Sequence, residues 1–293
     1  MDLRALLMGL AFAAMWSSAF TSARIIVAAA PPLSALALRF LISGLIAVLI
    51  AWAMGQNWRL TRAQWKATII FGICQNALYL GLNFVAMQTV EASLAAIIAS
   101  TMPLLVALSG WLFFGERLKA LAVAGLLAGV AGVAMIMGAR FGGGVDGVGV
   151  ALCVVGVVAL TVATLSLRGA ISGGNYMMVV GLQMLVGSAV LWVPALAFET
   201  VQIAWSPQLV AAFLYTTLVP GLAATFVWVL LVNRIGAVRA ATFHFLNPFL
   251  GVAIAAVLLG EALRALDLLG VAVIAGGILA VQLAKLPRAR TVE

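Results

Sequence analysis

Four polar side chains cluster in an otherwise apolar stretch of the first half of the chain: Gln75, Asn76, Tyr79 and Asn83. Their spacing of i, i+1, i+4 and i+8 places them on one face of an α-helix. Amide and phenol groups can hydrogen-bond the amino and carboxylate groups of a small molecule, so this face predicts the wall of a binding cavity. The alternative is that the same groups bond neighbouring helices, at about 0.6 kcal/mol per bond.

A second polar pair, His244 and Asn247, stands just before Pro248 in the second half. His244 is the only histidine, and an imidazole with its ordinary pKa of about 6.5 can carry a proton. A lone histidine can equally be a hydrogen-bonded core residue. We predict that this pair lines the cavity. Because the glutamates fall at the ends of the apolar segments rather than in their middles, we predict facilitated or weakly coupled transport.

Aromatic residues recur every four positions in the first apolar stretch, at Phe12, Trp16 and Phe20. They could pack against lipid and other helices, or form a wall on which the rings of a substrate stack. Trp16 is central and has a hydroxyl beside it, so we select Trp16 and Ser17 as candidate substrate contacts.

One cation, Arg39, lies inside an apolar stretch, where a charge costs at least about 2.5 kcal/mol. It could extend to the membrane interface, or it could serve as a gate or as the contact for a substrate carboxylate. Gln183 is near the corresponding position of the second half and is predicted to be its neutral counterpart.

Proline and glycine predict where the helices bend and where they touch. Pro103, Pro220 and Pro248 each remove a backbone donor within an apolar stretch, and we predict that they act as hinges. Two sets of glycines predict close packing of two peripheral helices: Gly125, Gly129 and Gly132, and Gly270, Gly276 and Gly277.

Enzymatic motifs are absent from the sequence: there is no HExxH, no GxSxG and no mid-segment acid pair. We therefore assign no catalytic residue and expect neither a metal nor a cofactor. Cys74 and Cys153 lie in apolar runs and are interpreted as small core residues.

The elements that must position these residues are membrane helices. The chain of 293 residues is 66% hydrophobic and 8% charged, with a mean hydropathy of +1.23, which excludes a soluble domain. Hydropathy predicts an all-α polytopic protein with ten spans, at roughly 5–29, 33–54, 67–88, 92–114, 118–138, 147–168, 176–198, 208–232, 236–259 and 264–284.

Basic residues predict the orientation. With the N-terminus in the cytoplasm, twelve of the 16 Lys and Arg residues fall on the cytoplasmic side and three on the other, with Arg39 set aside. Both termini are therefore predicted to be cytoplasmic. The net charge of +8 then reflects membrane sorting rather than a nucleic-acid partner.

The segment 95–116 recurs at 240–261 without a gap, so that Pro103 corresponds to Pro248 and Gly115-Glu116 to Gly260-Glu261. Two repeats of five spans follow, residues 1–141 and 142–293. Because five is odd, the repeats must be inserted in opposite orientations around a central cavity. The glycine-rich turn 141–147 is predicted to connect them.

These features together resemble a known family. Arg39-Phe40, the stretch from Ala95 to Pro103, the motif Phe114-Gly115-Glu116-Arg117 and its echo at Gly260-Glu261 resemble the EamA-type proteins of the drug/metabolite transporter superfamily. The resemblance covers nearly the whole chain. It implies a bacterial inner-membrane exporter, and the polar and aromatic features of the first half are similar to the YddG-type amino-acid exporters.

We expect a secondary transporter that exports small metabolites, amino acids including aromatic ones, by alternating access. The alternatives are export of drugs or other metabolites, such as cationic toxicants, and more remotely a channel or an intramembrane enzyme. Expected partners are the small-molecule substrate and membrane lipid, with the protein monomeric.

Overall fold

The computed structural model describes residues 3–141, 144–166 and 175–285, and these ranges are helical without a strand. They contain ten helices or helix chains long and apolar enough to cross a membrane, which confirms the predicted number of spans. The elements are α1 (Leu3–Val27), α2 (Pro32–Ala53), α3 (Arg62–Phe71), η1 (Gly72–Tyr79), α4 (Leu80–Ala86), α5 (Ala92–Ser100), α6 (Met102–Phe114), α7 (Ala120–Phe141), α8 (Gly147–Ser166), α9 (Tyr176–Phe198), α10 (Pro207–Leu218), η2 (Val219–Ala223), α11 (Ala224–Ile235), α12 (Ala237–Ala241), η3 (Thr242–Leu246), α13 (Asn247–Leu259) and α14 (Ala265–Lys285).

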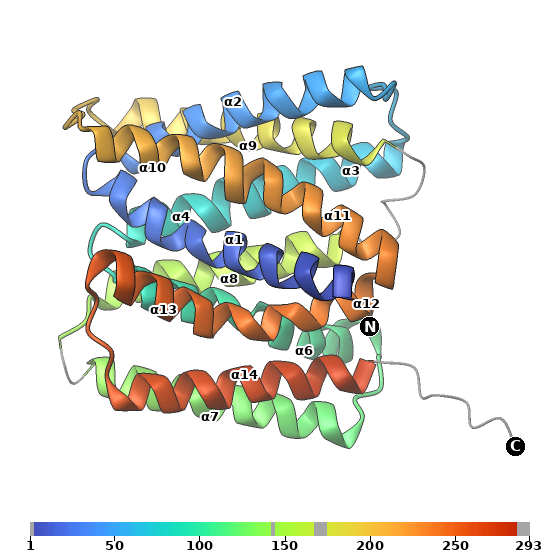
Figure 1. The fold of residues 1–293 in the computed structure, drawn as a ribbon, viewed down its shortest axis with the longest axis vertical. Helices are drawn as coiled ribbons and strands as arrows, with labels where there is room; N and C mark the ends of the chain where they lie inside the picture. The colour runs from blue at the N-terminus through green and yellow to red at the C-terminus, as the bar shows by residue number, and fades with distance from the viewer. Residues whose placement is uncertain (1–2, 142–143, 167–174, 286–293) are drawn as a thin grey trace, which may run out of the picture.

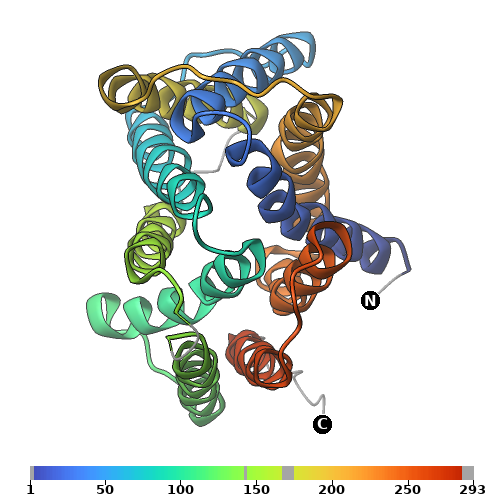
Figure 2. The same cartoon turned by 90° about the vertical axis from the view of Figure 1, so that its left-hand side faces the viewer.

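Two pairs of long helices form the two ends of the molecule along its longest axis. Helices α2 and α9 lie side by side at one end of its long axis, and α7 and α14 lie side by side at the other (Figure 1). Each pair takes one helix from each half of the chain. The remaining helices lie between these two ends and surround the centre of the molecule (Figure 2).

Glycines allow the close approach within both pairs. A Cβ atom on Gly277 of α14 would lie 2.5 Å from the carbonyl oxygen of Gly125 in α7, and one on Gly181 of α9 would lie 3.0 Å from that of Gly44 in α2. The predicted packing of the two glycine sets is confirmed, except at Gly276. This residue has open space around it, so its assignment to the interface was wrong; it faces away from α7.

The predicted prolines stand where helices change form. Pro103 follows a break at Thr101 and occupies the first turn of α6, and Pro248 occupies the first turn of α13 after the 3₁₀ segment η3. Pro220 lies inside the π-helical segment η2. At a first turn the missing N–H has no partner to lose, which is why the chain tolerates proline there; hinge motion at these points stays a prediction. The predicted connecting turn 141–147 lies partly outside the described residues.

Helix starts in one half are capped by side chains from the other. The Glu199 carboxylate accepts hydrogen bonds from the backbone N–H groups of Leu33 and Ser34 at the start of α2, at 2.7 and 2.8 Å. Glu261 does the same for Ala92 and Ser93 at the start of α5, at 2.8 and 2.9 Å. A negative charge at a helix start is favoured by the unpaired N–H groups and the helix dipole, so these contacts hold the two halves together.

An ion cluster connects the end of α7 to the starts of α5 and α14. The Arg140 guanidinium at the end of α7 donates two hydrogen bonds to Asp267 of α14, at 2.7 and 3.2 Å, and a third to Glu91, which precedes α5. Arg140 and Asp267 are buried, whereas the Glu91 side chain is 42% exposed.

Candidate functional site

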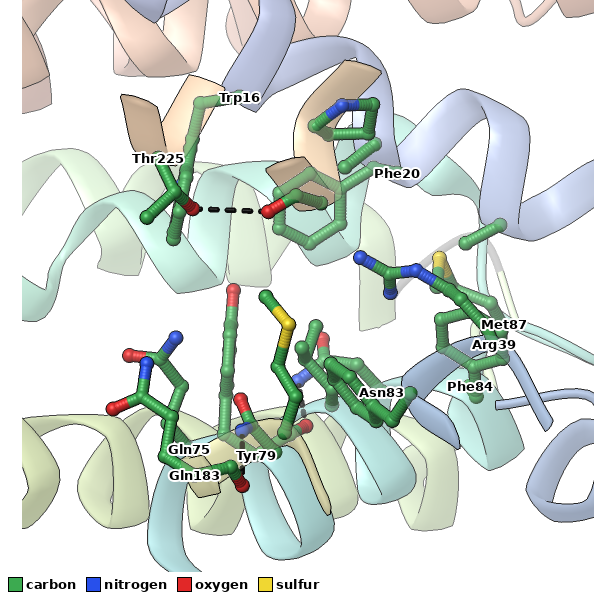
Figure 3. A pocket seen from close by; sticks show the side chains of 18 residues that line it. Trp16, Phe20, Arg39, Gln75, Tyr79, Asn83, Phe84, Met87, Gln183 and Thr225 are labelled. Carbon is green, nitrogen blue, oxygen red and sulfur yellow. Dashed lines mark hydrogen bonds between the residues drawn. The ribbon is translucent and has the colours of Figure 1, made fainter. Parts of the chain in front are cut away.

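A chamber that we name the Arg39 chamber lies among helices of both halves (Figure 3). Its volume is about 70 Å³. The residues that line it are Trp16, Ala19, Phe20, Ala23, Arg39, Phe40, Gln75, Asn76, Tyr79, Leu80, Asn83, Phe84, Met87, Gln183, Met184, Pro220, Gly221 and Thr225. The four-residue polar stripe predicted from the first half is therefore brought together with Arg39 and Gln183.

A second chamber, the His244 chamber, has a volume of about 230 Å³. It shares Trp16, Gln75, Gln183 and Thr225 with the Arg39 chamber, so these four side chains separate the two spaces. The other lining residues are mainly apolar or aromatic: Phe12, Phe71, Met102, Leu160, Thr164, Tyr176, Val179, Val180, Trp228 and His244.

The remaining predicted contacts line a third, small cavity of about 20 Å³. Ser17 and Asn247 both line it, and the Ser17 hydroxyl donates to the backbone carbonyl oxygen of Asn247 at 3.4 Å. Every residue predicted as a substrate contact therefore lines one of the three spaces. Contact with a substrate stays a prediction for each of them.

The four polar residues Gln75, Asn76, Tyr79 and Asn83 fall into two kinds: some bond to other parts of the protein, and others have polar groups that a ligand could bond. The Asn76 side-chain amide donates to the backbone carbonyl oxygen of Gln183 in α9 at 2.9 Å, and the Asn83 side-chain amide donates to that of Tyr79 at 2.8 Å, so both N–H donor groups bond within the protein. The Asn83 Oδ1 is buried and has no hydrogen-bond partner among the described residues. The Tyr79 hydroxyl and the Gln75 amide have no hydrogen-bond partner among the described residues, and Figure 3 shows both extending from η1 into the chamber. These two groups remain free for a ligand.

Arg39 is buried in the chamber wall, and only 5% of the residue is exposed. Its Nε donates to the carbonyl oxygen of Thr216 in α10 at 3.2 Å, and its guanidinium carbon stands 4.9 Å from the centre of the Phe40 ring. The position of Arg39 relative to the membrane interface stays a prediction. The first half supplies the arginine, and a carbonyl of the second half fixes its orientation.

His244 lies in an aromatic enclosure. Its ring is 5.5 Å from that of Phe12, edge to face, and 5.3 Å from that of Trp228, while its Nδ1 is hydrogen-bonded to the Asn247 amide at 3.0 Å. No acidic side chain lines any of the three spaces among the residues that the structure describes. The site can therefore offer one cation, neutral hydrogen-bonding groups and aromatic faces to a ligand.

Comparison with known proteins assigns this architecture to a family. The family model described as "EamA-like transporter family" matches residues 3–138 and again residues 147–283. The chain belongs to the EamA-like transporter family. The two matches correspond to the two five-span repeats.

Relatives of this EamA-family chain have names that agree with transport. The uncharacterized transporter YvbV of Bacillus subtilis is 27% identical over 250 residues, which is 85% of this chain and 82% of the relative. The aromatic amino acid exporter YddG of Ancylobacter novellus is 32% identical over 139 residues, about half of each chain (47% and 48%). A solved crystal structure matches with a TM-score of 0.68 and 23% identity over 97% of this chain and 98% of its own, which shows a shared fold.

Sequence reasoning missed the contribution of the eighth span to this EamA-family site. Thr225 and Trp228 of α11, three positions apart and so on one helical face, line the chambers together with Tyr176 at the start of α9. The spacing of Thr225 and Trp228 was the available signal. It was overlooked because one hydroxyl and one indole in an apolar helix do not stand out without knowing which face looks inward.

Proposed function

We propose that this protein is a secondary transporter that exports small metabolites, with aromatic amino acids as its main substrates, by alternating access through the central chambers. Support for a transporter comes from the family. The aromatic substrate is suggested by the name of the relative YddG, an aromatic amino acid exporter that is 32% identical over about half of each chain. We further propose that it resides in the bacterial inner membrane with both termini cytoplasmic.

One observation carries the proposal. Chambers walled by both repeats combine a buried guanidinium, free amide and phenol groups, and a cluster of aromatic rings. A guanidinium matches the carboxylate of an amino acid, and the rings of Phe12, Trp16 and Trp228 supply faces for an aromatic side chain. Since the lining comes from both repeats, rocking of one against the other would change access to the chambers.

Counterflow in liposomes tests this function. Purified full-length protein is reconstituted with unlabelled phenylalanine inside, and labelled phenylalanine is added outside. We expect saturable accumulation of label that depends on the internal amino acid. Loss of saturation, with uncoupled ion conductance, would indicate a channel instead; absence of counterflow for phenylalanine, tyrosine and tryptophan would refute the aromatic assignment.

Variants connect the flux to the chamber. Tyr79→Phe removes a hydroxyl without a protein partner, so we expect transport to fall about tenfold without loss of folded protein. Ser188→Ala is the matched control, because Ser188 is also a buried hydroxyl but bonds the backbone carbonyl oxygen of Ala37 in the α2–α9 contact and is not among the residues that line the chambers. Equal transport by the two variants would exclude Tyr79 as a substrate contact.

A further inference from the structure

The guanidinium of Arg39 has a charge but no counter-ion. Its Nε is bonded to a carbonyl oxygen, and no carboxylate among the described residues pairs with it, whereas Arg140 has two. Figure 3 shows the end of the side chain extending into the chamber toward Phe20 and Tyr79. Its terminal nitrogens are thus the groups in this wall that can donate charge-assisted hydrogen bonds.

A buried charge without a partner is costly, and the cost falls when an ion of opposite sign arrives. The guanidinium presents two parallel N–H donors, which match the two oxygens of a carboxylate. The chambers have no Asp or Glu in their described lining to neutralise an ammonium group, so a cationic ligand would meet Arg39 as an unscreened like charge.

The two chambers also differ in size and chemistry. The Arg39 chamber, about 70 Å³, has room for a small polar group, whereas the His244 chamber, about 230 Å³, is larger and has the rings of Phe12, Trp16 and Trp228 in or beside its wall. The two chambers adjoin, with Trp16 and Gln75 in the wall of both. A molecule with an anionic head and an aromatic body would match the pair of spaces.

We propose that Arg39 determines specificity by requiring a carboxylate, so that the substrate class is aromatic monocarboxylates whether or not they carry an amine, and that amines without a carboxylate are rejected. This inference rests on the proposed transport of aromatic substrates and narrows it. It extends the class to deaminated acids such as aryl 2-oxo acids, and it excludes cationic amines.

Three molecules with the same benzyl group test the inference on the unaltered protein. Phenylpyruvate keeps the carboxylate and lacks the amine, phenethylamine keeps the amine and lacks the carboxylate, and phenylalanine has both. We expect phenylpyruvate to inhibit labelled phenylalanine counterflow with a half-maximal concentration within several-fold of that of phenylalanine. Phenethylamine should be at least about tenfold weaker. Equal inhibition by phenethylamine would overturn the carboxylate requirement, and no inhibition by phenylpyruvate would overturn the inclusion of acids without an amine; both results leave transport intact.

Equilibrium binding of labelled phenylpyruvate to the purified protein separates this inference from the transport function. Binding that phenethylamine does not displace, in a protein without counterflow, would refute the proposed function and retain the specificity. Absence of both binding and counterflow would refute both.

Variants then assign the effect to Arg39. In Arg39→Gln, phenylpyruvate binding should weaken at least about tenfold and discrimination against phenethylamine should disappear, whereas Arg39→Lys should retain part of the discrimination because it keeps the charge. Arg24→Gln is the matched control, since Arg24 bonds the Met87 carbonyl oxygen and does not line either chamber. An equal loss of discrimination in Arg24→Gln would refute a local role for Arg39.

Discussion

The Arg140 cluster allows a prediction of stability with a worked magnitude. Replacing Arg140 by leucine leaves Asp267 buried without its two hydrogen bonds from the guanidinium. Removing one partner of a buried ion pair costs about 3–5 kcal/mol. Asp267 lies in the first turn of α14, where the helix start stabilises a negative charge by about 0.3–1 kcal/mol, so the expected net loss of unfolding free energy is about 2–5 kcal/mol.

The contribution of the third member is smaller. Glu91 is 42% exposed, and solvent screens its pairing with Arg140, so Glu91→Gln should cost less than about 1 kcal/mol. The double variant Arg140→Leu/Asp267→Leu removes both buried charges and leaves apolar groups in contact. It should recover most of the loss, because replacing a buried pair by apolar residues is often neutral or stabilising.

The assay is reversible unfolding in mixed micelles with increasing SDS, followed by circular dichroism, on the single, double and Glu91→Gln variants. The expected order of unfolding free energy is unaltered protein and double variant highest, Glu91→Gln slightly lower and Arg140→Leu lowest. A double variant as unstable as Arg140→Leu would refute the reasoning, since the cost would then not come from an unpaired charge.

Two further predictions concern helix packing and capping. Gly277→Ala should lower the free energy of unfolding by about 1–3 kcal/mol, because its Cβ would meet the backbone of α7. Gly276 has open space around it, so Gly276→Ala should be neutral or stabilising by up to about 1 kcal/mol. The same unfolding assay measures both variants, and equal effects would contradict the described packing. Glu261→Ala should cost about 0.5–2 kcal/mol and increase hydrogen exchange at the Ala92 and Ser93 amides, because it removes the cap of α5. Unchanged exchange at those two amides would show that the cap does not hold this helix start.

Much of the fold could be predicted because membrane helices are set by length and hydropathy. The ten spans and the repeat followed from apolar stretches and an ungapped recurrence of Pro103 as Pro248. The internal form of the spans did not follow. Tyr79 belongs to a π-helical segment and His244 to a 3₁₀ segment, and neither departure from α-helix has a reliable signature in residue types.

Residues of the candidate site could be predicted where a charged or polar side chain lies in an apolar membrane helix, because burying such a group there costs free energy. A charge at Arg39 and amides at Gln75 and Gln183 are conspicuous in apolar helices, and all three line the Arg39 chamber. The direction in which such a side chain points depends on other helices, so the sequence left open whether Arg39 reaches the interface. Trp228 was missed for the converse reason, because an indole is common in membrane helices and only the packing shows that it encloses His244.

The helix caps show which residues of α2 and α9 correspond between the two repeats. The sequence alone placed Gln183 only near the position that corresponds to Arg39. Glu199 caps the start of α2 at Leu33 and Ser34, and Gln56 accepts hydrogen bonds from Met177 and Met178 at the start of α9, both at 3.1 Å. The capped residues therefore correspond at an offset of 144 positions, from Leu33 to Met177.

At that same offset Arg39 corresponds to Gln183, and both line the Arg39 chamber. The two repeats share the capping geometry but differ in residue type: the cap is the Glu199 carboxylate for α2 and the Gln56 amide for α9, and the wall has the Arg39 cation in the first half and the Gln183 amide in the second. The single positive charge of the chamber is thus a difference between two otherwise corresponding positions. Arg39→Gln would remove this difference, which makes it a direct test of whether the asymmetry of the halves selects the substrate.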